Sequence, residues 1–263
     1  MQRALPFLIN LRQSGCKTFV ECTPAFLGRD VELLSRLAEM SGLQILTNTG
    51  YYGAVDGKYL PEHAFREDAR QLAARWIREA GEGIEGSEIL PGFIKIGVNK
   101  GPLNEMDRKL VEAAALTHKK TGLSISSHTG DGAAAMDQIS ILKSFGVHSG
   151  AFRWVHAQNE TNMDMHIEAA KSGAWIEFDG INEKSADVHI RYLINMKKHK
   201  MLGQCLISQD SGWYHVGEEN GRAYRKYTYL FEQFLDALTT QGFSRRESKM
   251  LLVRTSTSAA FPQ

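Results

Sequence analysis

The sequence predicts an α/β fold of the TIM (β/α)8-barrel type, with one strand too few to close the barrel. Short β-branched runs alternate with amphipathic helical stretches through 263 residues, which is close to the size of one such barrel. The connections contain no linker rich in Pro, Gly or Ser. We therefore expect parallel strands with right-handed crossovers in a single domain over residues 1–263.

Each strand is predicted from a short apolar run that is bounded by turn residues. FIKIGV is the clearest example, because it is almost continuously apolar, as a strand buried on both faces should be. The predicted strands lie at residues 17–22, 43–47, 93–98, 123–128, 152–156, 174–178 and 204–208. A closed barrel of this type needs eight strands, so the pattern falls one short.

Helices are predicted from apolar residues spaced three and four positions apart, and their ends from capping residues. Asp30 is placed to cap a helix over residues 31–40, and Gly42 to end it. A single long helix is expected over residues 62–80. Its inner face is expected to carry Phe65, Leu72, Ala73 and Trp76. The other helices are expected at residues 4–13, 104–120, 132–145, 161–171, 185–199, 224–238 and 244–253.

Composition and charge argue against several classes of protein. The formal net charge is +1 and no basic run occurs, so we expect neither a nucleic-acid partner nor attachment to a membrane. No apolar stretch approaches the ~18 residues of a membrane-spanning helix. Residues 1–14 are too polar for a signal peptide, which predicts a cytoplasmic protein, or an exported one if an upstream signal has been lost. The cysteines Cys16, Cys22 and Cys205 are odd in number and widely spaced, which predicts neither disulfides nor a structural zinc site.

Lys95 lies inside an apolar predicted strand, between Ile94 and Ile96. Strand alternation places its side chain on the face opposite both isoleucines. A lysine in the interior of a parallel strand is costly unless it is paired or chemically altered. Two interpretations stay open. Either the ammonium reaches water at the mouth of the barrel, or the amine takes up carbon dioxide to become a metal-bridging carbamate, which presents two oxygens like a carboxylate.

Three further metal-capable side chains stand where predicted strands end. His128 ends SISSH, His156 ends FRWVH, and Asp210 follows LISQ. Barrels bind ligands at the carboxyl ends of their strands, so these residues are expected at one rim. Taken singly, each has an ordinary interpretation as a half-buried histidine or a turn cap. Together with Lys95 they are the ligands that zinc takes in catalytic sites, with Asp210 as a ligand, a general base for water, or both.

In its longer motifs the chain resembles the phosphotriesterase-related proteins of the amidohydrolase superfamily. The resemblance covers nearly the whole sequence and is carried, in the family's order, by TPAFLGRDVELLSRLAEMSGLQILTNTGYYG, FIKIGVNKGPLNEMDRKLVEAAALTHKKTGLSISSHTG, FRWVHAQNE, GAWIEFDGI and LISQD. Any one of these motifs alone is weak evidence, but together they are specific. The resemblance implies a zinc-dependent hydrolase that cleaves an ester bond, in a lactone, a carboxylic ester or a phosphoester, through a metal-activated hydroxide.

The resemblance also assigns the metal ligands. The family holds two divalent metals, usually zinc, at the carboxyl ends of the strands, and Mn²⁺ or Co²⁺ are alternatives. Lys95 would be the carbamate bridge, made with carbon dioxide. His128 and His156 would hold the more exposed metal. Asp210 would bind the buried metal and take the proton from the attacking hydroxide.

One departure from the family concerns the first strand, which in relatives carries a His-x-His pair for the buried metal. This sequence has no His-x-His anywhere and no histidine before His63. Relative to the family, the barrel is therefore expected to be incomplete at its N-terminus and to lack the first strand. Two explanations compete: the start of a longer gene product is missing, or the protein is a natural member without that strand. In the second case one metal on Lys95, His128 and His156 is expected in place of two. Open strand edges would also favour pairing with another chain, such as a homodimer.

A second departure concerns proton transfer and the substrate. Relatives that hydrolyse phosphotriesters place an aspartate three residues after the second histidine, where this chain has Asn159. Asparagine cannot accept that proton, which leaves lactone or other ester hydrolysis open. Tyr51 and Tyr52 fall where lactonase-like relatives place a tyrosine near the substrate, although either could anchor its loop. Trp213 is the third candidate for contact with a small-molecule ester.

A different class of function stays open beside the enzyme. A non-catalytic or truncated relative with an incomplete metal site would only bind a small molecule or a partner at the mouth of the barrel. The absence of His-x-His favours this alternative, whereas four metal-capable residues at strand ends favour the hydrolase.

Overall fold

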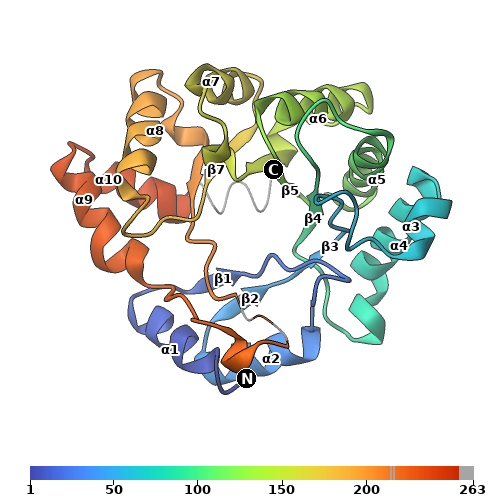
Figure 1. Ribbon diagram of the computed structural model, residues 1–263, viewed down its shortest axis with the longest axis horizontal. Coiled ribbons are helices and arrows are strands. Elements are labelled where there is room, and N and C mark those ends of the chain that lie inside the picture. The colour runs from blue at the N-terminus through green and yellow to red at the C-terminus, as the bar shows by residue number, and fades with distance from the viewer. Residues whose placement is uncertain (214, 216, 255–263) are drawn as a thin grey trace.

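Parallel strands form the inside of the molecule and helices surround them, as Figure 1 shows. The computed structural model describes residues 1–213, 215 and 217–254. Its strands are β1 (Thr18–Val20), β2 (Gln44–Leu46), β3 (Asn48–Thr49), β4 (Phe93–Gly97), β5 (Ile125–His128), β6 (Phe152–Val155), β7 (Trp175–Phe178) and β8 (Cys205–Ile207). Every predicted strand is confirmed at its place; β2 occupies the strand predicted at residues 43–47, whereas β3, which follows after Thr47, was not predicted.

The strands pair in the order of the chain, and every pairing is parallel. β1 pairs with β2, while β3 to β8 form a second, continuous sheet. Between these two pieces the chain itself is continuous, because only Thr47 separates β2 from β3. Within the described residues no pairing joins β8 back to β1. The ring is therefore open at one place between its last and first strands, as the shortage of one predicted strand required.

The helices alternate with the strands along the chain, except that β2 leads directly into β3 and that two helices follow each of β3 and β8. They are α1 (Leu5–Gln13), α2 (Val31–Ser41), α3 (Glu62–Arg66), α4 (Ala69–Glu82), α5 (Glu105–Thr121), α6 (Gly132–Ser144), α7 (Met163–Lys171), α8 (Ala186–Lys198), α9 (Leu235–Thr240) and α10 (Arg245–Lys249). The predicted cap of α2 is confirmed, because the Asp30 side chain accepts from the Leu33 backbone N–H. Gly42 ends the same helix in the left-handed conformation.

The prediction of one long helix over residues 62–80 is wrong, because the chain breaks after α3 and starts again as α4. Asp68 accepts from the Gln71 backbone N–H, and the Gln71 side chain accepts from the Asp68 N–H. This capping box begins a new helix and requires Asp68 to be extended. Phe65, which was expected on the inner face, is consequently 56% exposed on the separate short helix.

The helix predicted over residues 224–238 also begins later than expected. Its helical turns start at Leu230, where a π-helical turn precedes α9. The Gln209 side chain accepts from the Leu230 N–H and donates to the Tyr227 carbonyl. Tyr224 and Tyr227 contact each other through their hydroxyls. These contacts hold residues 224–229 outside the helix, although the sequence pattern there is compatible with one.

Strand alternation separates an apolar layer from a polar lumen. Ile94 and Ile96 are fully buried in the main hydrophobic core between strands and helices, where each contributes roughly 1.5–3 kcal/mol. Lys95, between them on β4, points the other way and is 4% exposed. The predicted orientation of this side chain is therefore confirmed.

A glycine allows the segment after β3 to run close beside Lys95 of β4. Gly50 has a φ of +114°, which side chains rarely adopt. A Cβ atom on it would lie 2.2 Å from the carbonyl oxygen of Lys95. The segment continues parallel to β4, where Tyr52 pairs with Gly97, whereas Tyr51 pairs with the segment on its other side, after β1.

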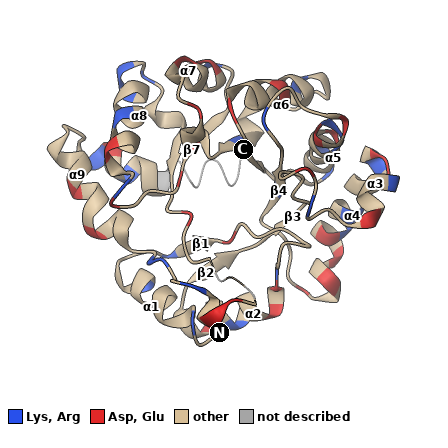
Figure 2. Cartoon of the chain, in the orientation of Figure 1, with Lys and Arg blue, Asp and Glu red and all other residues tan. Residues whose placement is uncertain are grey.

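Charged side chains of both signs are interspersed over the outer helices in Figure 2. Of the helices in the described part of the chain, none is both long and apolar enough to cross a bilayer. Cys16, Cys22 and Cys205 are free thiols, which confirms the expected absence of disulfides.

Candidate metal centre

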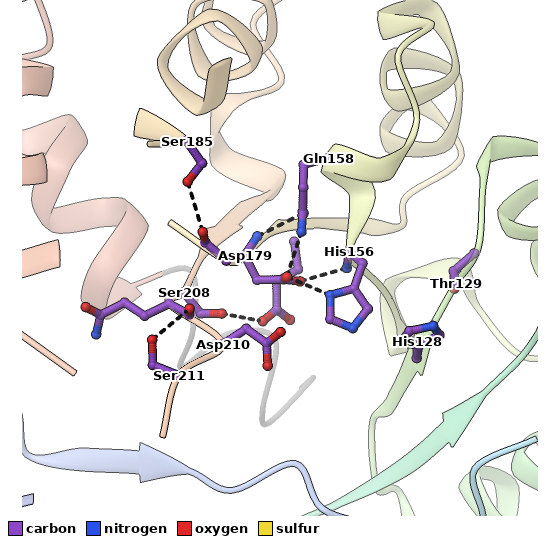
Figure 3. A network of polar contacts seen from close by, with 12 residues as sticks. His128, Thr129, His156, Gln158, Asp179, Ser185, Ser208, Asp210 and Ser211 are labelled. Atoms are coloured by element: carbon purple, nitrogen blue, oxygen red, sulfur yellow. Dashed lines mark hydrogen bonds and ion pairs between the residues drawn. The ribbon is translucent and has the colours of Figure 1, made fainter. Parts of the chain in front are cut away.

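Three side chains that follow β6, β7 and β8 converge at the carboxyl ends of these strands. His156, Asp179 and Asp210 each offer a ligand atom, and these atoms all lie within 4.8 Å of one another. In Figure 3 His156 lies between His128 and Asp210. Two of the three residues, His156 and Asp210, were predicted to be metal ligands. The structure brings these two residues together at one rim of the ring and adds Asp179 to them.

Asp179 fixes the orientation of His156. Its Oδ1 accepts from His156 Nδ1 at 2.6 Å, and its Oδ2 accepts from the His156 backbone N–H at 2.7 Å. This double contact holds His156 at a φ of +64°, a left-handed conformation that costs about 1–3 kcal/mol outside glycine. Because Nδ1 is occupied, Nε2 is the ring nitrogen that remains for a ligand.

Asp179 makes hydrogen bonds through its side chain, its backbone N–H and its carbonyl. These contacts suit a residue that orients a ligand better than they suit a metal ligand. Asp179 is 1% exposed. Gln158 Nε2 donates to Asp179 Oδ1 at 2.7 Å, and the Asp179 N–H donates to Gln158 Oε1 at 3.0 Å. His189 Nε2 lies 2.7 Å from the Asp179 carbonyl oxygen. A carboxylate behind a ligating imidazole fixes the ring and raises its basicity.

This arrangement decides the protonation of His156. Burial opposes a charge on the ring, but the hydrogen bond and the charge of Asp179 outweigh burial and raise the pKa of His156. In the metal-free protein the imidazole therefore holds a proton up to a higher pH than an ordinary histidine. A cation bound at Nε2 would have to displace that proton.

His128, at the end of β5, packs against His156. Their ring centroids are 4.4 Å apart at an interplanar angle of 74°. His128 Nδ1 lies 3.3 Å from the Tyr52 hydroxyl. Burial, and then the positive charges of His156 and Lys95, lower the pKa of His128 to about 3. His128 is therefore neutral at physiological pH, as a metal-binding imidazole must be.

Lys95 lies on the lumen side of the same rim, across the ring of Tyr52 from His128. Its Nζ is 5.6 Å from the Tyr52 ring centroid, and within the described residues it donates one hydrogen bond, to the carbonyl of Ile96 at 3.1 Å. Burial lowers the pKa of Lys95, against the opposing effects of Cys22 and Glu177. Burial thus favours the neutral amine, the form that can react with carbon dioxide.

Asp210 follows β8 in a strained turn, with a φ of +41°. Trp213 Nε1 donates to its Oδ1 at 3.3 Å, and Arg225 donates to its backbone carbonyl. Burial, and then the negative charge of Asp179, raise the pKa of Asp210. These contacts leave Oδ2 of Asp210 available to a cation or a proton.

The two tyrosines after Gly50 have different surroundings. Tyr52 faces the site, where it contacts His128 and Lys95, and burial raises its pKa to about 12. Tyr51 is 6% exposed in the core, where its ring packs on Trp76 and its hydroxyl lies 3.0 Å from His63 Nε2. These contacts favour the loop-anchor role for Tyr51 and leave Tyr52 as the candidate for substrate contact.

Sequence reasoning missed the supporting residues. The sequence alone assigns no role to Asp179, Gln158 or Glu177. Glu177, on β7, accepts from Ser208 Oγ at 3.2 Å. For Asp179 a signal existed, because it directly follows its strand, as His156 does. The contacts of Gln158 left no signal in the sequence.

The low pKa of His128 predicts that the metal-free protein loses stability in acid. Below its ordinary pKa of 6.5, the histidine takes up a proton in the unfolded chain, but in the folded protein it does so only near pH 3. Unfolding free energy should therefore fall as the pH drops from 6.5 towards 3. Replacing His128 with Asn should reduce this fall by about 1–2 kcal/mol at pH 4.5.

Chemical denaturation of the metal-free protein at pH 7.5 and pH 4.5 measures this effect. The variant His199→Asn, at an exposed position, serves as the matched control and should keep the wild-type acid sensitivity. If the unfolding free energy of His128→Asn differs between pH 7.5 and pH 4.5 by as much as that of the wild type, the folded protein does not hold His128 neutral.

Comparison with known proteins adds independent evidence. The sequence model of the Phosphotriesterase family matches residues 3–258. A phosphotriesterase homology protein of Escherichia coli is 27% identical over 248 residues, which are 92% of this chain and 83% of that protein. An aryldialkylphosphatase of Saccharolobus solfataricus is 29% identical over 168 residues, 64% of this chain and 52% of that protein. An N-acetyltaurine hydrolase of Dictyostelium discoideum is 28% identical over 269 residues, 96% of this chain and 71% of that protein.

The fold agrees with the sequence comparison. A crystal structure of the phosphotriesterase homology protein of Escherichia coli, with phosphate in its active site, superposes with a TM-score of 0.87. The identity is 25%, and the match covers 98% of this chain and 88% of that one. The predicted TIM-barrel fold class is thereby confirmed.

Proposed function

Because the chain belongs to the phosphotriesterase family, we propose that it hydrolyses an ester bond in a lactone, a carboxylic ester or a phosphoester with the help of bound zinc. The observation that supports this proposal most directly is the convergence of His156, Asp179 and Asp210 within 4.8 Å. The family-level function is hydrolysis. The choice of metal and of the ester bond is our proposal.

The donors at this rim fit a divalent cation. His156 offers Nε2, since Nδ1 contacts Asp179, and Asp210 offers Oδ2. His128 is neutral and packs edge-on beside His156, so its Nε2 is a third donor and the second nitrogen among them. Imidazole and carboxylate are the ligands that zinc takes in catalytic sites, and Mn²⁺ or Co²⁺ can occupy such a set. When bound, the cation supplies polarisation of the scissile carbonyl or phosphoryl group and activation of a water.

Lys95 would complete the set after reaction with carbon dioxide. In this step the amine nitrogen bonds to the carbon of carbon dioxide, and the nitrogen loses a proton to solvent. The product is a carbamate with two oxygens and a negative charge. A buried neutral amine is required for this step, and burial at 4% exposure favours it.

The protein's own groups have distinct roles in the proposed reaction. Asp210, whose pKa is raised by burial and by Asp179, would accept the proton of the nucleophilic water at Oδ2. Asp179 would act as a positioning residue that keeps His156 Nε2 aimed at the site. Tyr52 has its hydroxyl 3.3 Å from His128, where it would contact the substrate oxygen.

Asn159 directs the proposal towards lactones and carboxylic esters. It is exposed, three residues after His156, and an amide cannot relay a proton to solvent there. The relative from Saccharolobus solfataricus is an aryldialkylphosphatase, so phosphotriesters belong in the substrate panel. The relative from Dictyostelium discoideum acts on N-acetyltaurine, which makes an amide substrate the matching control.

A second candidate function is small-molecule binding without catalysis. The donors that converge among the described residues, His156 and Asp210 with His128 beside them, favour it because they can hold one cation more readily than two. A binding protein would take up the ligand with or without metal and would release no product.

Metal removal distinguishes the two functions. Treatment with a chelator should reduce the hydrolysis of aryl esters and lactones by at least ~100-fold, because a metal contributes several kcal/mol to such reactions. Added zinc should restore the rate. Initial rates on a panel of aryl esters, lactones, a phosphotriester and an acyl amide would be measured for both states. Equal rates before and after chelation would contradict the metal-dependent mechanism, and no product from any substrate would favour the binding function.

A further inference from the structure

A cavity beside Asp210 is lined by groups that the proposed reaction does not use. It has a volume of about 360 Å³ and is lined by Trp213, His215, Ala223 and Arg225. The cavity adjoins the metal centre through Trp213, whose Nε1 donates to Asp210 Oδ1 at 3.3 Å. A substrate with its scissile bond at the centre can therefore extend a substituent into this space.

Arg225 gives the cavity its chemical character. Its Cζ lies 6.0 Å from the ring of Trp213, so the guanidinium stands over the indole. Within the described residues its one hydrogen bond uses Nη2 and goes to the Asp210 carbonyl. A guanidinium has five N–H donors in a planar fork, so donors remain for a ligand.

The acidic residues nearest to this cavity have other partners. Glu218 accepts from Arg222 and lies 3.9 Å from His215 Nδ1. Asp210 directs Oδ1 to Trp213, and its side chain belongs to the metal centre. Arg225 therefore provides a positive charge beside Asp210, on the outer side of the centre.

We propose that this cavity selects esters that carry a carboxylate a few bonds from the scissile carbonyl, and that Arg225 binds that carboxylate. Trp213 forms the apolar wall along which the intervening carbons lie. Arg–carboxylate contacts are often bidentate and geometrically specific. The preference for a carboxylate should therefore depend on the planar arrangement of the guanidinium N–H groups as well as on the charge. This inference rests on the proposed function, which it deepens by naming the substrate class.

A matched pair of substrates tests the preference. Mono-(4-nitrophenyl) succinate and 4-nitrophenyl butyrate share the leaving group and the acyl length, and differ in the carboxylate. The zinc-loaded wild type should have a kcat/KM at least ~10-fold higher for the succinate ester, and this ratio should fall as salt is raised to about 0.5 M. A ratio near one in the wild type would overturn the inference.

Three variants assign the preference to Arg225. Arg225→Gln keeps a donor for the Asp210 carbonyl but removes the charge, so the ratio should drop to near one through KM. Arg225→Lys should keep part of the preference for the succinate ester. The control is Arg222→Gln, because Arg222 is exposed in the same loop and pairs with Glu218, and this variant should keep the wild-type ratio. If Arg222→Gln lowers the ratio as much as Arg225→Gln, the preference arises from general charge and the inference is wrong.

A binding measurement keeps this test separate from the proposed function. Succinamate and butyramide would be compared on the metal-free protein by ligand-observed NMR. If neither nitrophenyl ester is hydrolysed, the carboxylic-ester part of the proposed function fails, and binding alone decides the inference. Tighter binding of succinamate that is lost in Arg225→Gln supports the carboxylate site, whereas equal binding of both amides overturns it.

Discussion

Replacing Lys95 with methionine is expected to abolish tight metal binding and to reduce hydrolysis by about 1,000-fold or more. Methionine has a similar length and packs in an apolar strand, but it cannot form a carbamate. Loss of the carbamate would remove a bridging or terminal anionic ligand. The transition state would thereby lose several kcal/mol of stabilisation. Lys95 is 4% exposed and donates one hydrogen bond to Ile96, so the variant should fold and should be no less stable than the wild type.

Metal content by mass spectrometry, thermal unfolding and initial rates would be measured together. Lys119→Met is the matched control, since Lys119 is exposed on α5 and contacts only the Phe145 carbonyl among the described residues. In the wild type the intact mass should increase by one carbon dioxide when metal is loaded in bicarbonate. A Lys95→Met protein with wild-type metal content and rate would remove Lys95 from the mechanism.

Replacing Asp179 with asparagine is expected to lower both metal affinity and kcat/KM by about 10–100-fold. Both Asp179 oxygens accept hydrogen bonds from His156, and Gln158 donates to one of them. An asparagine places an NH₂ group where one of the two Asp179 oxygens was, and there it would face an N–H donor of His156. His156 would then no longer be held in one tautomer and one orientation. A buried donor without a partner costs a further ~1–3 kcal/mol of stability.

The titration of His156 separates positioning from a general loss of stability. Asp179 raises the pKa of His156 against the effect of burial, so in the metal-free variant that pKa should fall, as measured by NMR. Asp164→Asn is the control, because Asp164 is an exposed acid in the first turn of α7. If the pKa of His156 and the metal affinity are both unchanged in Asp179→Asn, Asp179 has no role in positioning His156.

The sequence could predict the frame of the site because that frame is local. A strand of alternating or continuous apolar residues fixes which side chain points inward, and parallel pairing brings all strand ends to one rim. This is why Lys95 faces the lumen and why His156 and Asp210 meet, although they are far apart in the chain.

Other features depend on contacts that no local pattern reveals. The break between α3 and α4 arises because Asp68 and Gln71 form a capping box within an otherwise helical pattern. The different surroundings of Tyr51 and Tyr52 follow from the close approach of Gly50 to β4 and from the pairing of the two tyrosines with different segments. Asp179 acquires its role from His156, 23 residues earlier, through a hydrogen bond that only the folded chain can make.

The location of a bound cation tests the central claim most directly. Crystals of the zinc-loaded protein would be measured at the zinc absorption edge to find each metal by anomalous scattering. The account predicts a peak about 2.0–2.2 Å from His156 Nε2 and from an oxygen of Asp210, with His128 and a modified Lys95 completing the coordination. A peak elsewhere, or no peak in protein that hydrolyses its substrate, would contradict it.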